Sequence, residues 1–169
     1  FEDGAPAKLP DEFYSSELLV DRLIKYIDEG ERSAPYFGYL AFQAVHIPVQ
    51  APKEFSDHYA GKFDAGWDVL REKIFDQQKK LGVIPADAEL TKRHDEIPSW
   101  DEMSDQLKPV LARQMEIYAG FLEQVDHAVG RVVEAIADLG VLDDTLIYYI
   151  IGDNGASAEG TTTGTPNIF

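Results

Sequence analysis

Two short polar clusters hold the residues best suited to chemistry. The first, residues 43–48, contains His46, and the second, residues 152–155, places Asp153 and Asn154 between two glycines. An imidazole can donate to an anionic oxygen or transfer a proton near neutral pH. Carboxylate and amide oxygens are the hard ligands that Ca²⁺ and Mg²⁺ prefer. The clusters therefore predict a histidine that binds or protonates an anion, and a divalent metal site.

Both clusters also have an ordinary structural interpretation. Asn154-Gly155 is a favoured pair for a hairpin turn, although residues 156–164 do not supply the apolar strand that a hairpin needs. A lone histidine such as His46 is often a core or loop residue that donates to a backbone carbonyl. Residue types and spacing alone leave these interpretations open.

An uncharged apolar segment directly precedes each cluster, at residues 35–42 and 145–151. Such segments are typical of strands covered on both faces. Apolar periodicity predicts helices at residues 15–29, 67–81 and 107–139. Helices that alternate with uncharged strands indicate an α/β fold with a largely parallel sheet. Because ligands bind beyond the carboxyl ends of parallel strands, both clusters are expected on one edge of that sheet.

The helix at residues 107–139 is the clearest element, with a bend expected near Gly120. Acidic side chains lie mostly off its apolar stripe and are expected at the surface: Glu116, Glu123, Glu134 and Asp138. Pro and Gly punctuate segment 43–66, which favours a loop with at most short helix, and segment 83–106 holds Pro85 and Pro98 amid polar residues, which favours a long loop.

Composition excludes several classes of protein. The formal charge is −16, from 15 Lys+Arg against 31 Asp+Glu. This charge argues against a nucleic-acid partner, because binding phosphates requires cations. No apolar run reaches the roughly 18 residues of a membrane span. The chain has no cysteine, so it holds no disulfide, thiolate metal site or cysteine nucleophile.

The two clusters and their surroundings resemble the bacterial arylsulfatases. The likeness covers nearly the whole chain from about residue 14 onward. Each motif alone would be weak evidence for the family, but the ordered set of motifs is specific. The segments that carry it are 35–52, 62–68, 81–87, 114–119 and 144–157.

The resemblance implies an alkaline-phosphatase-like α/β fold and hydrolysis of a small-molecule sulfate ester. It implies one Ca²⁺ or similar divalent ion, with Asp153 and Asn154 among its ligands, and a formylglycine nucleophile. By similarity, His46 would contact the sulfate or the ester oxygen. Related phosphate-cleaving enzymes tend to carry Asp-His where this chain has Asp153-Asn154, which favours the single cation of a sulfatase.

The chain departs from the family pattern in what it lacks. The Cys/Ser-x-Pro/Ala-x-Arg motif that supplies the nucleophile, and an earlier pair of Asp ligands, do not occur in it. A later lysine would lie beyond Phe169. Residues 1–169 are therefore predicted to be an internal fragment of a sulfatase catalytic domain, with an excursion at 53–106 between two core strands. The fragment alone is expected to be inactive.

Three other functions stay open at this point. One is hydrolysis of a phosphodiester or a phosphonate monoester on the same fold. The second is a noncatalytic binding or assembly module that has kept the fold. The third is a plain acidic globular domain in which His46 and Asp153 are structural.

Overall fold

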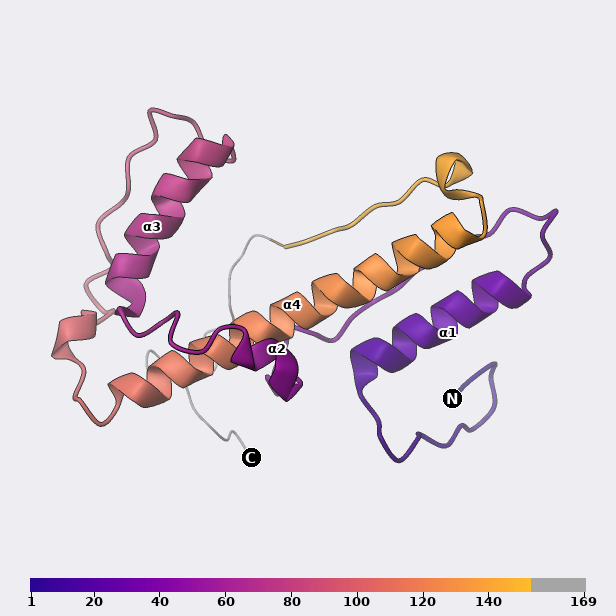
Figure 1. Cartoon of the computed structure of the whole chain (residues 1–169), viewed down its shortest axis with the longest axis horizontal. Coiled ribbons are helices and arrows are strands. Elements are labelled where there is room, and N and C mark those ends of the chain that lie inside the picture. Colours follow the sequence, from indigo (N-terminus) through magenta and orange to yellow (C-terminus); the bar gives the residue numbers. More distant parts are fainter. Residues whose placement is uncertain (153–169) are drawn as a thin grey trace. The chain divides into compact units, whose positions relative to one another are not determined.

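The computed structural model describes residues 1–152, and their regular structure is helical (Figure 1). The elements are α1 (Ser15–Glu29), α2 (Lys53–Asp57), α3 (Gly66–Leu81), η1 (Trp100–Glu102), α4 (Lys108–Asp138) and η2 (Leu142–Asp144). The three long helices confirm the prediction from apolar periodicity, with ends that agree within one residue. No helix in the described part of the chain is both long enough and apolar enough to cross a membrane.

The chain divides into two compact units, and α4 contributes to both. The first unit combines residues 1–48 with residues 122–151, and the second is built on residues 49–121. The prediction of a single catalytic-domain fragment with an excursion at 53–106 is not tested by this division.

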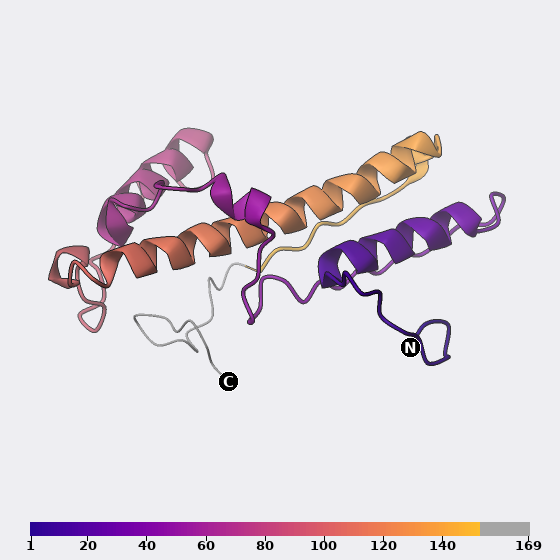
Figure 2. The ribbon, with the colours of Figure 1, turned by 60° about the horizontal axis from the view of Figure 1, so that its bottom comes forward.

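In the first unit, α1 lies alongside the C-terminal half of α4 and runs in the same direction (Figures 1 and 2). Val20 of α1 is fully buried, and Val125 and Ala128 of α4 are only 6% and 1% exposed. At the rim, Arg131 donates to Asp21 at 2.5 Å. The apolar stripes of two amphipathic helices thus supply the core of this unit.

The two predicted strands, residues 35–42 and 145–151, form no sheet in the described part of the chain. Both are extended traces (Figure 1), and the one β-bridge among residues 1–152 is an isolated pair at Glu2 and Ala5. A strand requires the backbone of a neighbour to satisfy its N–H and C=O groups. No such neighbour lies within the described residues. The predicted sheet is therefore not found among the described residues, whose regular structure is helical.

The two extended segments still follow the course that a parallel sheet requires. Both run opposite to α1 and to the C-terminal half of α4 (Figures 1 and 2). Near their starts, the Tyr36 hydroxyl lies 3.1 Å from Thr145 Oγ1. Because Thr145 Oγ1 donates its hydrogen to the Val141 carbonyl at 2.8 Å, Tyr36 is the donor to Thr145.

Exposure along the second segment alternates with the period of a β-strand. Leu146, Tyr148 and Ile150 are 77%, 77% and 86% exposed, whereas Ile147 and Tyr149 are 42% and 45% exposed. A period of two is the signature of an extended chain with one face covered. The apolar pattern thus predicts the local conformation, although the partner strands are not among the described residues.

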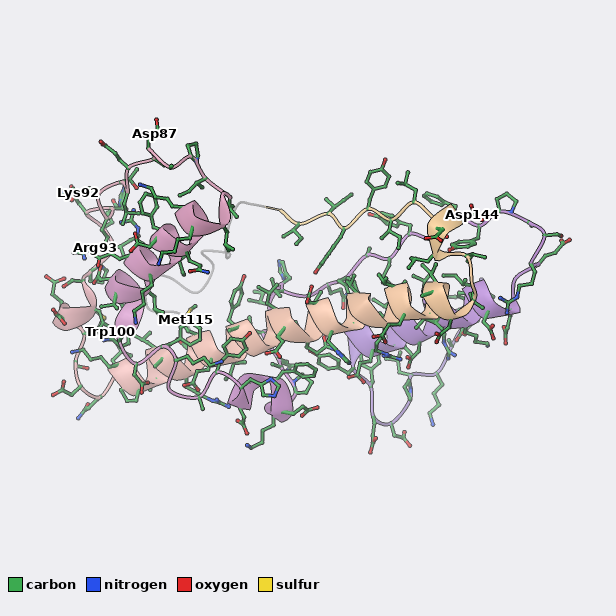
Figure 3. The ribbon with its side chains drawn as sticks, turned by 45° about the horizontal axis from the view of Figure 1, so that its top comes forward. Asp87, Lys92, Arg93, Trp100, Met115 and Asp144 are labelled. Carbon is green, nitrogen blue, oxygen red and sulfur yellow. The ribbon has the colours of Figure 1, made fainter. Side chains whose placement is uncertain are left out.

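In the second unit, the loop between α3 and α4 folds back onto α3. The rings of Trp67 and Trp100 meet edge to face, with centroids 4.9 Å apart, and Trp67 Nε1 donates to the Pro98 carbonyl at 3.1 Å. Asp68 accepts from the Trp100 N–H at 2.8 Å and from Arg93 at 2.6 Å. Figure 3 shows Arg93 and Trp100 beside α3. The loop is therefore fixed by a small core and by one shared carboxylate.

Candidate functional site

His46 lies on an exposed loop that follows the first extended segment. Its backbone N–H donates to the Gln43 carbonyl at 2.9 Å, and its ring Nδ1 lies 3.0 Å from the Ile47 carbonyl. Because a carbonyl oxygen only accepts, Nδ1 carries the hydrogen of this bond. Nε2 is then the nitrogen left for a ligand, as an acceptor in the neutral ring and a donor in the charged ring. His46 is an exposed loop residue and does not belong to the core.

Both predicted metal ligands, Asp153 and Asn154, lie outside the described residues. Their proximity to His46 therefore stays a prediction. Among residues 1–152, no group of three His, Cys, Asp or Glu side chains is arranged to hold a metal ion. The donor set of a carboxylate and an amide oxygen fits a hard cation such as Ca²⁺.

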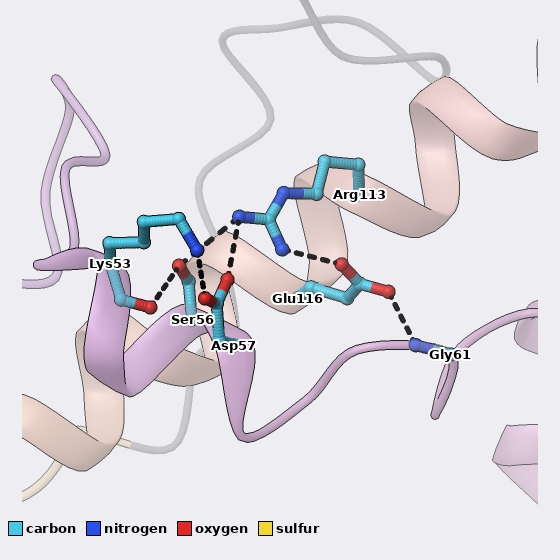
Figure 4. Close-up of polar contacts among 6 residues, drawn as sticks. All are labelled: Lys53, Ser56, Asp57, Gly61, Arg113 and Glu116. Atoms are coloured by element: carbon cyan, nitrogen blue, oxygen red, sulfur yellow. Dashed lines mark hydrogen bonds and ion pairs between the residues drawn. The ribbon is translucent and has the colours of Figure 1, made fainter.

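A cluster that sequence reasoning missed holds α2 against α4 (Figure 4). Arg113 of α4 donates to Glu116 Oε2 at 2.7 Å and to the Ser56 hydroxyl at 3.2 Å, and it lies 3.6 Å from Asp57. The other oxygen of Glu116 accepts from the Gly61 N–H at 2.8 Å. We call these five residues the α2 clamp.

Glu116 of α4 is predicted from the sequence to lie at the surface, but the structure buries it. Its side chain was expected off the buried stripe, but the residue is only 7% exposed. The burial is tolerated because each carboxylate oxygen has a donor. Arg113 and Glu116 are three residues apart, a spacing that favours ion pairs on a helix and is the sequence signal for the clamp.

The clamp shifts the titration of its members in the directions that ion pairing dictates. The hydrogen bond from Arg113 is the main cause that lowers the pKa of Glu116, and the Gly61 N–H adds to it, while burial opposes both. The same bond raises the pKa of Arg113. The pKa of Asp57 is lowered mainly by its hydrogen bond from Lys53. The charges of the clamp are therefore present at neutral pH.

A surface hollow of about 390 Å³ lies on the loop beside α3. Its polar lining residues are Lys92, Arg93, His94, Asp95 and Glu102. Lys92 is paired with Asp95 at 2.5 Å, and Arg93 is paired with Asp68 at 2.6 Å. Figure 3 shows Lys92 and Arg93 on this loop. Because these cations already have carboxylate partners, the hollow does not form an anion site.

Comparisons with known proteins match nearly the whole chain. The sulfatase family profile covers residues 2–167. An uncharacterized sulfatase of Schizosaccharomyces pombe is 39% identical over 154 residues, which are 87% of this chain and 26% of that protein. The arylsulfatase of Klebsiella aerogenes is 32% identical over 157 residues, 92% of this chain and 33% of that protein. A multifunctional alkaline phosphatase superfamily protein of Trinickia caryophylli is 23% identical over 145 residues, 85% of this chain and 28% of that protein.

Proposed function

The chain belongs to the sulfatase family as part of a sulfatase-type domain, and we propose that it is part of a longer enzyme that hydrolyses aryl sulfates with the help of a divalent metal ion. The family hydrolyses sulfate esters, and the match over residues 2–167 is the observation that carries the proposal. The aryl preference is supported by the similarity to the Klebsiella arylsulfatase. The chain spans 26% and 33% of the lengths of the two most similar relatives described above, so the rest of a complete site would come from residues outside it.

His46 is proposed to act on the oxygen that leaves with the phenol or alcohol. Its Nδ1 hydrogen is directed to the Ile47 carbonyl, so Nε2 is the atom that would meet the ester. A protonated Nε2 would donate to the leaving oxygen and offset the negative charge that develops as the S–O bond breaks. An exposed loop at the end of an extended segment is a suitable place for such a group.

Asp153 and Asn154 are proposed as two of the metal ligands. Their carboxylate and amide oxygens suit Ca²⁺ or a similar hard ion. When bound, such an ion would neutralise charge on the sulfate group. The formylglycine nucleophile and the remaining ligands would come from outside this chain, which contains no cysteine.

The test uses the complete protein that contains these residues. It should hydrolyse 4-nitrophenyl sulfate in the presence of Ca²⁺, whereas the isolated 169-residue chain should not. Asp153→Ala should weaken Ca²⁺ binding, measured by titration calorimetry, and lower kcat/KM. Asp138→Ala removes an exposed carboxylate at the end of α4 and should change neither quantity. Unchanged Ca²⁺ affinity and rate in Asp153→Ala would refute the metal assignment, and turnover by the isolated chain would refute the need for outside residues.

A second candidate function is hydrolysis of a phosphodiester or a phosphonate monoester. The similarity to the multifunctional alkaline phosphatase superfamily protein of Trinickia caryophylli favours it. The ratio of kcat/KM for 4-nitrophenyl sulfate to that for bis(4-nitrophenyl) phosphate and for a phenylphosphonate monoester decides between the two. The Asn at position 154 leads us to expect the sulfate to be preferred.

A further inference from the structure

We propose that Gln43 is a second binding residue for the sulfate group, beside His46 on the same loop. The inference rests on the proposed function, because it assumes that His46 contacts the ester. Both residues belong to the first unit, and one backbone hydrogen bond relates their positions. His46 would donate to the leaving oxygen, and the side-chain amide of Gln43 would donate to another oxygen of the same sulfate group.

Residues 43–46 form a tight turn. The His46 N–H donates to the Gln43 carbonyl at 2.9 Å, which closes a four-residue turn that begins at Gln43 and ends at His46. In such a turn the Cα atoms of the first and last residues are less than about 7 Å apart. The two side chains therefore start from neighbouring points of the backbone. They are also of similar length, so both can reach one small group.

Gln43 and His46 are the two polar residues of this turn, and both are exposed. Between them, Ala44 and Val45 are apolar and only partly exposed. The His46 ring is already oriented, because its Nδ1 donates to the Ile47 carbonyl. The described part of the chain offers no hydrogen-bond partner to the side-chain amide of Gln43. This amide is therefore available to a ligand that binds at His46 Nε2.

An uncharged amide suits the binding of an anion by a chain this acidic. The sequence has 31 acidic against 15 basic residues, yet residues 34–52 contain no Asp, Glu, Lys or Arg. An anion at this loop therefore meets no carboxylate of the loop itself. The Gln43 amide can donate to a sulfate oxygen, and a hydrogen bond to a charged acceptor is stronger than one between neutral groups.

The two residues should affect different kinetic parameters. His46 would contact the oxygen whose negative charge grows as the S–O bond breaks, so its effect belongs to the transition state. The oxygen proposed for Gln43 stays on the sulfur and is negatively charged in the substrate and in free sulfate as well. An interaction of equal strength in substrate and transition state lowers KM without raising kcat. Gln43 should therefore affect KM and the inhibition constant of inorganic sulfate.

The experiment measures kcat and KM for 4-nitrophenyl sulfate, and the inhibition constant of inorganic sulfate, in the complete protein. Gln43→Met keeps the length of the side chain but removes the donor. It should raise KM and the inhibition constant by about tenfold and change kcat by less than about twofold. Gln43→Glu replaces the donor with a negative charge and should raise both constants by about a hundredfold or more.

Two further variants serve as references. Gln106→Glu adds the same charge at an exposed glutamine in a turn of the second unit, and it should leave all three quantities unchanged. His46→Ala should instead lower kcat, because it removes the group that assists the leaving oxygen.

The outcomes separate this inference from the proposed function. If both Gln43 variants leave KM and the inhibition constant unchanged while His46→Ala lowers kcat, the inference is wrong and the proposed function stands. If the Gln43 variants lower kcat as His46→Ala does and leave the inhibition constant unchanged, Gln43 does not bind the sulfate group and the inference is wrong. An equal effect of Gln106→Glu and Gln43→Glu would assign the change to net charge and would also overturn it. If the complete protein hydrolyses no sulfate ester, the proposed function fails, and the inference fails with it.

Discussion

A methyl group added at Gly120 should destabilise the protein, whereas the same change ten residues later should stabilise it. In Gly120→Ala, the new Cβ would lie 2.6 Å from the Ser56 nitrogen. Ordinary contact begins at 3.4 Å, and the difference from 2.6 Å means that α2 must withdraw by about 0.8 Å. Because all the nearest atoms are backbone atoms, no side chain can simply turn away.

The magnitude follows from two opposing terms. Overpacking of this kind costs about 1–3 kcal/mol, whereas alanine gains about 1 kcal/mol over glycine within a helix. Gly130→Ala is the matched control, since it lies in the same helix and a Cβ there meets nothing within 4 Å. The helix-propensity term cancels between the two variants, so Gly120→Ala should be the less stable by about 1–3 kcal/mol.

Urea unfolding of the complete protein measures the difference, as a shift in midpoint at constant m-value. Hydrogen exchange gives the local readout, because amides of residues 53–61 should exchange faster in Gly120→Ala and not in Gly130→Ala. Equal stability of the two variants, or unchanged exchange in α2, would refute the close packing of α2 on α4. That result would also remove the structural basis of the clamp.

Three further predictions concern stability. The pKa of Glu116 is lowered from its ordinary 4.5, so the stability that its charge confers should be present above pH 4.5 and lost as the pH falls through the folded-state pKa. The unfolding free energies of wild type and Glu116→Gln should therefore converge in acid. Gln124 is fully buried and its amide has no partner among the described residues, so Gln124→Met should raise the unfolding free energy by about 1 kcal/mol in urea. Gly66 and Gly82 both have positive φ, but only a Cβ at Gly66 would meet Trp100, at 2.1 Å; Gly66→Ala should lower Tm well below that of Gly82→Ala.

The helices of this chain are predictable because their signals are local. The apolar stripe of residues 15–29 is enough to predict α1, since it depends only on spacing along one segment. The contacts of the loop before α4 are not predictable in this way. Asp68 accepts from Trp100, which is 32 residues away, and no periodic pattern records such a contact.

The local conformation around His46 follows from the sequence, because an uncharged extended segment leads into the loop that carries it. The role of His46 in a site stays a prediction. Glu116 was not predictable, because its burial depends on Arg113 and on a glycine amide 55 residues away. The sequence pattern predicts that a charged residue near the edge of an apolar stripe is exposed, unless its ion-pair and hydrogen-bond partners are known. The meeting of His46 with Asp153 stays a prediction, because Asp153 lies outside the described residues.

Among residues 1–152, the predicted strands have the expected extended conformation but no paired neighbour. Leu146, Tyr148 and Ile150 point one way along an extended segment, and each is at least 77% exposed. Burial of a large apolar side chain contributes about 1.5–3 kcal/mol, so covering three of them is worth roughly 5–9 kcal/mol. That amount is comparable to the whole stability of a typical domain, about 5–15 kcal/mol. The chain spans 26% and 33% of the lengths of the two sulfatases compared above. Because burial of these three side chains would contribute so much free energy, we expect this face to pack against the remainder of the sulfatase fold.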